Sequence, residues 1–122
     1  MTWILSSVLM IVLDATFLWF MSPVFSRIIQ KIQGSPLQLY YRGVIPCYVF
    51  LAVALNYFIL LPHKSVFDAF LLGICINGVY ETLMYSVFKD WPLSTVLIDT
   101  LWGGILFASI TWIIYRLNNL FR

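Results

Sequence analysis

The stretch of residues 80–104, YETLMYSVFKDWPLSTVLIDTLWGG, decides the fold, because two apolar runs meet there at a short polar turn. The turn contains Asp90, a suitable helix cap, and Pro92, which suits the first turn of a helix. Neither flanking run contains a lysine or arginine. We therefore predict two antiparallel helices, at about 66–88 and 94–115, joined by this turn.

The rest of the chain has the same apolar character. The 122 residues are 62% hydrophobic and 10% charged, whereas soluble domains carry about 25% charged residues. One small core cannot hide this much apolar surface from water, so the solvent must be lipid. Two further runs reach the length of about 20 residues that crosses a bilayer. We predict an all-α integral membrane four-helix bundle, a single transmembrane domain over residues 1–122 with helices at about 3–22, 43–61, 66–88 and 94–115.

The first connection has a helical pattern of its own. In VFSRIIQKIQ, residues 24–33, apolar side chains share one helical face, while Arg27 and Lys31 share the other, and Gly34 follows. This pattern is typical of a helix lying in the membrane interface. We predict a short interfacial helix at about 24–33; packing of that helix on the end of the bundle is the alternative.

Two of the five acidic residues have ordinary structural roles. Ser65 and Asp68 form an S-x-x-D capping box, in which the carboxylate suits a helix N-terminus. Asp90 is expected to cap the next helix. These roles leave Asp14, Glu81 and Asp99 inside apolar runs without an explanation.

The three remaining acids should lie in one layer. At 1.5 Å per residue, Asp14 lies roughly 16 Å, and Glu81 and Asp99 roughly 22 Å, from the side of the N-terminus. An ionised carboxylate in mid-membrane costs about 2.5–3.5 kcal/mol, so we expect all three to face inward. At least one should carry a proton at neutral pH, because burial and mutual repulsion disfavour the charged form.

Polar and small residues share the faces of these acids. Asn77 precedes Glu81 by one helical turn, and Trp102 follows Asp99 by three residues. Glycines nearby let another helix approach closely. The predicted proton or ligand site comprises Asp14, Glu81, Asp99, Asn77, Tyr80 and Trp102. Structural roles are predicted for Gly103, Gly104, Pro92, Ser65, Asp68 and Asp90. The alternative is that the polar residues only hydrogen-bond helices together.

Several classes of function find no support. The net charge of +2 is too small and scattered for nucleic-acid binding. His63 is the only histidine, so we predict no metal, and no cofactor is expected. The chain has no Ser-His-Asp set and no glycine-rich phosphate loop, and catalytic residues remain unknown. The expected partners are the lipid bilayer, a second copy in a homodimer, and a small ligand or cation.

Basic and aromatic residues give a weak orientation. Trp91, like Trp19, is expected at one membrane interface. The excess of basic residues favours a cytoplasmic location for loops one and three, in the cell membrane. That side carries Arg27, Lys31, Arg42 and Lys89, and the other carries Lys64, Arg116 and Arg122.

The motifs VLDATFLWF, YETLMY and WPLSTVLIDTLWGG resemble an uncharacterised family of small four-helix membrane proteins, domain of unknown function 2177. The resemblance spans almost the whole chain. It implies acids at the positions of Asp14, Glu81 and Asp99, and it supplies no activity. Family members often read Tyr-(Asp/Glu)-Leu-Thr-Asn where this chain reads YETLMY, so a polar pair is lost after Glu81.

Three functions compete. The first is proton-linked transport of a cation or small amphiphile through the buried carboxylates. The second is a non-catalytic assembly or lipid-binding subunit. The third is a membrane-embedded lipid-modifying enzyme with Glu81 and Asp99 as acid and base, which requires their environments to differ.

Overall fold

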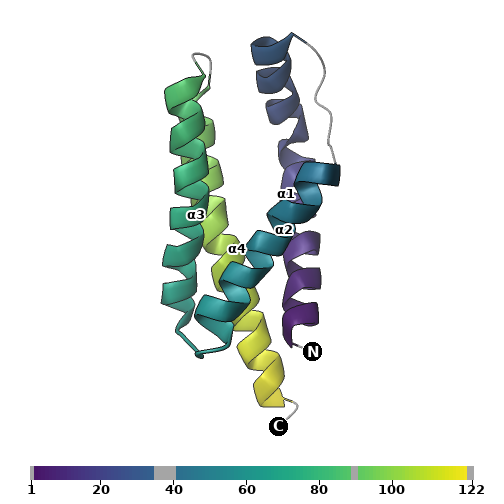
Figure 1. Cartoon of the computed structure of the whole chain (residues 1–122), viewed down its shortest axis with the longest axis vertical. Helices are drawn as coiled ribbons and strands as arrows, with labels where there is room; N and C mark the ends of the chain where they lie inside the picture. The colour runs from purple at the N-terminus through teal and green to yellow at the C-terminus, as the bar shows by residue number, and fades with distance from the viewer. Residues whose placement is uncertain (1, 35–40, 89–90, 121–122) are drawn as a thin grey trace.

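The computed structural model describes residues 2–34, 41–88 and 91–120, and these residues are helical apart from short turns (Figure 1). Four helices are long and apolar enough to cross a membrane. This confirms the all-α membrane fold. The elements are α1 (Thr2–Gln33), α2 (Tyr41–Leu55), the π-helical segment η1 (Asn56–Leu60), α3 (Val66–Val87) and α4 (Leu93–Leu120).

The first helix is longer than the sequence suggested. The expected separate helix at about 24–33 is helical, but it continues the membrane helix without a break, through Pro23. Proline cannot donate to the carbonyl four residues earlier, that of Trp19. Ser22 donates its hydroxyl to that carbonyl at 3.0 Å instead, as serine does in membrane helices. The 32 residues of α1 span ~48 Å at the usual helical rise, well beyond the apolar thickness of a bilayer.

Helices α3 and α4 form a closely packed pair (Figure 1). Their backbones approach at glycine: a Cβ atom on Gly73 would overlap the carbonyl group of Gly103, 2.6 Å from its carbon. A Cβ on Gly104 would lie 2.7 Å from Ile74. Gly103 and Gly104 therefore have the close-packing role that the sequence predicts.

The N-termini of α3 and α4 differ in how they are capped. Ser65 accepts a hydrogen bond from the backbone N–H of Asp68 at 3.0 Å, so the predicted cap is confirmed. Pro92 immediately precedes α4 and accepts from the N–H of Val96 at 3.3 Å; it stands one position before the first turn. Asp90 lies outside the described residues.

Two apolar clusters fill the interior. The larger contains Met10, Leu55, Phe107 and Ile110 and joins α1, α2, α3 and α4. The smaller joins the end of α1 to the start of α4 through Ile28, Trp91 and Val96. Along α1, Asp14 lies between Met10 and Ile28; along α4, Asp99 lies between Val96 and Phe107. The acids therefore occupy the zone between the two clusters.

Many large apolar side chains point outward. Trp19 is 72% exposed and Phe50 is 74% exposed. Such exposure is unfavourable in water but suits a helix surrounded by lipid tails.

Candidate functional site

Asp14 ties three helices together. Its carboxylate accepts hydrogen bonds from Tyr48 Oη of α2 at 2.6 Å and from Trp102 Nε1 of α4 at 2.9 Å. The Trp102 ring is also stacked on Phe17, with 4.6 Å between ring centroids. Both carboxylate oxygens of Asp14 are thus engaged, and the side chain is fixed in position.

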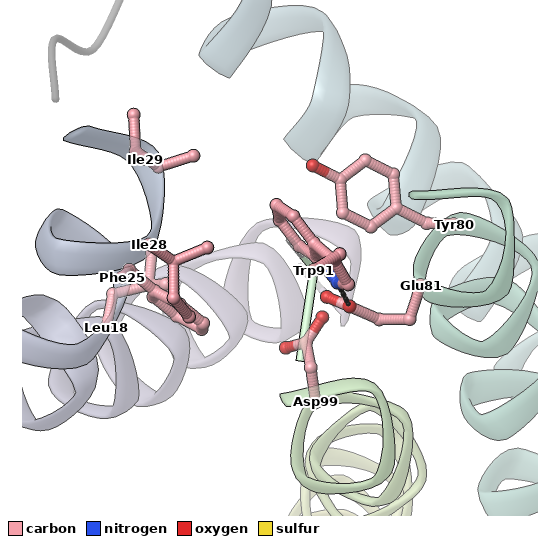
Figure 2. Close-up of a pocket in the computed structure, with 8 residues that line it drawn as sticks. All are labelled: Leu18, Phe25, Ile28, Ile29, Tyr80, Glu81, Trp91 and Asp99. Atoms are coloured by element: carbon pink, nitrogen blue, oxygen red, sulfur yellow. Dashed lines mark hydrogen bonds between the residues drawn. The ribbon is translucent and has the colours of Figure 1, made fainter. Parts of the chain in front are cut away.

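Glu81 is buried against the turn between α3 and α4. It is 2% exposed, and its Oε2 accepts a 2.8 Å hydrogen bond from Trp91 Nε1 (Figure 2). The Trp91 ring is 8% exposed and packs into the smaller apolar cluster, so it turns inward, and its depth at the membrane interface stays a prediction. A buried indole N–H needs an acceptor, and Glu81 provides it.

Asp99 faces Glu81. Figure 2 shows the carboxyl groups of Glu81 and Asp99 directed toward one another. Two carboxyl groups can share a hydrogen bond only when one of them carries a proton.

The donors around the cluster indicate where such a proton would lie. Asp14 accepts two hydrogen bonds and Glu81 accepts one from an indole N–H. Among the described residues, no N–H or other O–H group donates to the Asp99 side chain. Because donors stabilise the anion, a proton shared by Glu81 and Asp99 would be favoured on Asp99.

Asp14 and Asp99 both line a cleft of about 640 Å³ between the helices. Asn77, Tyr80 and Cys47 add polar or polarizable groups to its lining, and the other walls are apolar. The amide of Asn77 donates to the backbone oxygen of Asp99 at 3.0 Å. Asn77 therefore fixes the backbone of α4.

A smaller cavity of about 220 Å³ is also lined by Asp99. Figure 2 shows its wall of apolar α1 side chains opposite the two carboxyls, with the Tyr80 hydroxyl directed away from them. Leu18, Tyr80 and Asp99 line both cavities. Asp99 is thus the acid that both hollows share.

In the structure Asp14 is hydrogen-bonded to Trp102, and Glu81 faces Asp99. Tyr80 lies at the edge of this region and is 53% exposed. Sequence reasoning missed Tyr48 as a partner of Asp14. The helical rise would have indicated it, because the predicted spans place both residues within about 12 Å of the same membrane face.

A second polar contact lies nearer the N-terminus. Asn56, the first residue of η1, donates to Ser6 Oγ at 2.9 Å and to the carbonyl of Ala52 at 2.8 Å. Both side chains are buried, Ser6 at 0% and Asn56 at 1% exposed. Ser6 and Asn56 hydrogen-bond to each other, and this contact holds α1 against the end of α2.

The described residues contain no group of three His, Cys, Asp or Glu side chains that could hold a metal ion.

The model of one protein family, described as "Predicted membrane protein (DUF2177)", matches residues 1–116. The chain belongs to this family. The matched residues include all three acids and nearly all of α4, so the DUF2177 assignment covers the whole candidate site. Among curated proteins and solved structures, none matches this chain. The description of DUF2177 gives a membrane location and states no activity.

Proposed function

We propose that this protein exchanges a proton on Asp99 for a lipophilic cation bound in the cleft, and so carries the cation across the membrane. One observation carries the proposal: Asp99, whose carboxyl group faces that of Glu81, also lines the 640 Å³ cleft. A carboxyl group that faces a ligand cavity can bind either a proton or a cationic ligand.

The chemistry of the cleft favours an organic cation. Its volume falls within the range of about 300–1,000 Å³ found for small-molecule sites. Its walls include Phe50, Leu51 and Tyr80, which suit an apolar body and can place an aromatic face against a positive charge. The ranges 3–22, 43–61, 66–88 and 94–115 contain no lysine or arginine. A bound cation would therefore supply a charge partner that these ranges lack.

Proton and cation exclude one another at Asp99. Loss of the proton would leave two adjacent carboxylates, which repel strongly in a medium of low polarity. A cation beside Asp99 offsets this repulsion, so its binding releases the proton. The coupling is reciprocal, and a proton returning to Asp99 expels the cation.

The weak excess of basic residues around loops one and three supports a cell-membrane protein with these loops in the cytoplasm. Four helices make a thin pathway, which supports a homodimer as the transporting unit.

The test is transport of ethidium, an aromatic cation, in liposomes that contain only this protein. An imposed pH gradient should drive ethidium flux, and Asp99→Asn should abolish both flux and proton release on binding. Asp68→Asn is the matched control, since Asp68 is an exposed acid at the start of α3.

Other outcomes would favour the competing functions. Ethidium flux that is unchanged in Asp99→Asn would contradict the proposal. Binding without flux would favour a lipid-binding or assembly subunit. A modified lipid formed without any gradient would indicate an enzyme.

A further inference from the structure

The cleft and the smaller cavity meet at three residues. Leu18 of α1, Tyr80 of α3 and Asp99 of α4 line both hollows. Because these residues come from three helices, the two hollows adjoin at one level of the bundle. The carboxyl group of Asp99 lies at that level.

The other lining residues of α1 follow an order along the helix. Asp14, which precedes Leu18 by one helical turn, lines the cleft and not the cavity. Phe25 and Ile29, which follow Leu18, line the cavity and not the cleft. Along α1, the cleft therefore comes first and the cavity second.

Helices α3 and α4 show the same arrangement. On α3, which runs in the same direction as α1 (Figure 1), Asn77 lines the cleft, and Glu81, one turn later, lines the cavity. On α4, which runs in the opposite direction, Leu106 lines the cleft, and Trp91, just before the helix, lines the cavity. The hollows therefore lie end to end along the bundle, with Asp99 at their junction.

We propose that the ligand is an elongated quaternary ammonium ion, with its charge beside Asp99 and an apolar group on either side of that charge. This inference rests on the proposed function and names the class of cation. The volumes of about 640 Å³ and 220 Å³ predict a larger group in the cleft and a smaller one in the cavity. Tyr80 and Trp91 both line the cavity, and aromatic rings suit an ammonium ion that has no proton to donate.

The test compares two ammonium ions that differ in one arm. Benzyldimethyloctylammonium has two apolar arms, whereas octyltrimethylammonium has a methyl group in place of the benzyl group. Isothermal titration calorimetry of the full chain in a neutral detergent gives the dissociation constant of each. Ile29→Trp places a larger side chain in the cavity wall. Its control is Ile32→Trp, since Ile32 packs against the same apolar cluster and lines neither hollow.

Ile29→Trp should weaken binding of the benzyl compound about tenfold, the effect of excluding one aromatic group from an apolar site. The same variant should leave the affinity for octyltrimethylammonium unchanged, and Ile32→Trp should leave both affinities unchanged. Phe25→Ala enlarges the cavity from the same wall, so it should bind the naphthylmethyl analogue more tightly than the wild type does. This second variant tests the inference even if Ile29→Trp does not fold.

Two results would overturn the inference alone. These are equal effects of Ile29→Trp on the two ammonium ions, and no gain for the naphthylmethyl analogue in Phe25→Ala. Ethidium flux that still depends on Asp99 would then leave the proposed function intact. Failure of the wild type to bind either ammonium ion, together with no ethidium flux, would overturn both.

Discussion

Trp102 donates its indole N–H to Asp14 at 2.9 Å, across 88 positions of sequence. This contact joins the first and last membrane helices within the layer of acids. The hydrogen bond also occupies one carboxylate oxygen of Asp14, so that this oxygen is not available to a ligand. Together with the hydrogen bond from Tyr48, it makes Asp14 the fixed acid and leaves Asp99 as the exchangeable one.

Replacement of Trp102 by phenylalanine should reduce the free energy of unfolding by about 1–2 kcal/mol, because the N–H is lost while an aromatic ring remains beside Phe17. Equilibrium unfolding in mixed micelles measures this change. Trp19→Phe removes an exposed indole and is the control. Equal stability of Trp102→Phe and wild type would show that the hydrogen bond contributes nothing measurable.

Replacement of Gly73 by alanine should separate α3 from α4. The new methyl group would overlap the Gly103 carbonyl group, and we expect a loss of about 3 kcal/mol, the upper part of the usual range for overpacking. At Gly78 the nearest atom to a new Cβ is 3.5 Å away. Gly78→Ala should therefore leave stability unchanged or raise it slightly, since alanine favours the helix. The same unfolding measurement compares the two, and similar losses would refute the close approach.

A protonated carboxyl group should be visible by infrared spectroscopy at neutral pH. Its C=O stretch should persist in Asp14→Asn and disappear in Asp99→Asn, because the proposed function places the shared proton on Asp99. As pH rises from about 5 to about 9, the band should weaken when the proton leaves the pair. An Asp99→Asn protein that retains the wild-type band would place the proton on another acid.

The thiol of Cys47 should report water in the cleft. Cys47 and Cys75 are both free and exposed, but only Cys47 is among the residues that line the cleft. In liposomes, a water-soluble maleimide should label the Cys75→Ser variant, which keeps Cys47, faster than the Cys47→Ser variant. Labelling that is equally slow in both would mean that water does not enter the cleft.

Spacing along the chain predicted much of this arrangement. Four apolar runs of sufficient length predicted the helices, and the helical rise predicted similar depths for Asp14, Glu81 and Asp99. The Ser65 cap depends only on two residues three positions apart, so the spacing along the chain was enough to predict it.

Contacts that depend on the path of the chain could not be predicted. The continuity of α1 through Pro23 depends on Ser22, whose hydroxyl occupies the carbonyl that proline leaves unpaired. The position of Trp91 depends on whether its ring turns outward to the interface or back over Glu81. The position of Trp91 near the end of a helix allows both orientations of its ring. Only the packing of α1 against α4 favours the orientation over Glu81.

The glycine contact between α3 and α4 has a consequence for motion. Helices whose backbones touch at Gly73 and Gly103 cannot slide past one another without collision. Glu81 and Asp99 therefore belong to one rigid body and keep their mutual distance through any rearrangement. Alternating access to opposite membrane faces would have to come from rocking of α1 and α2 against this rigid pair, with the hydrogen bond between Asp14 and Trp102 as the contact that breaks.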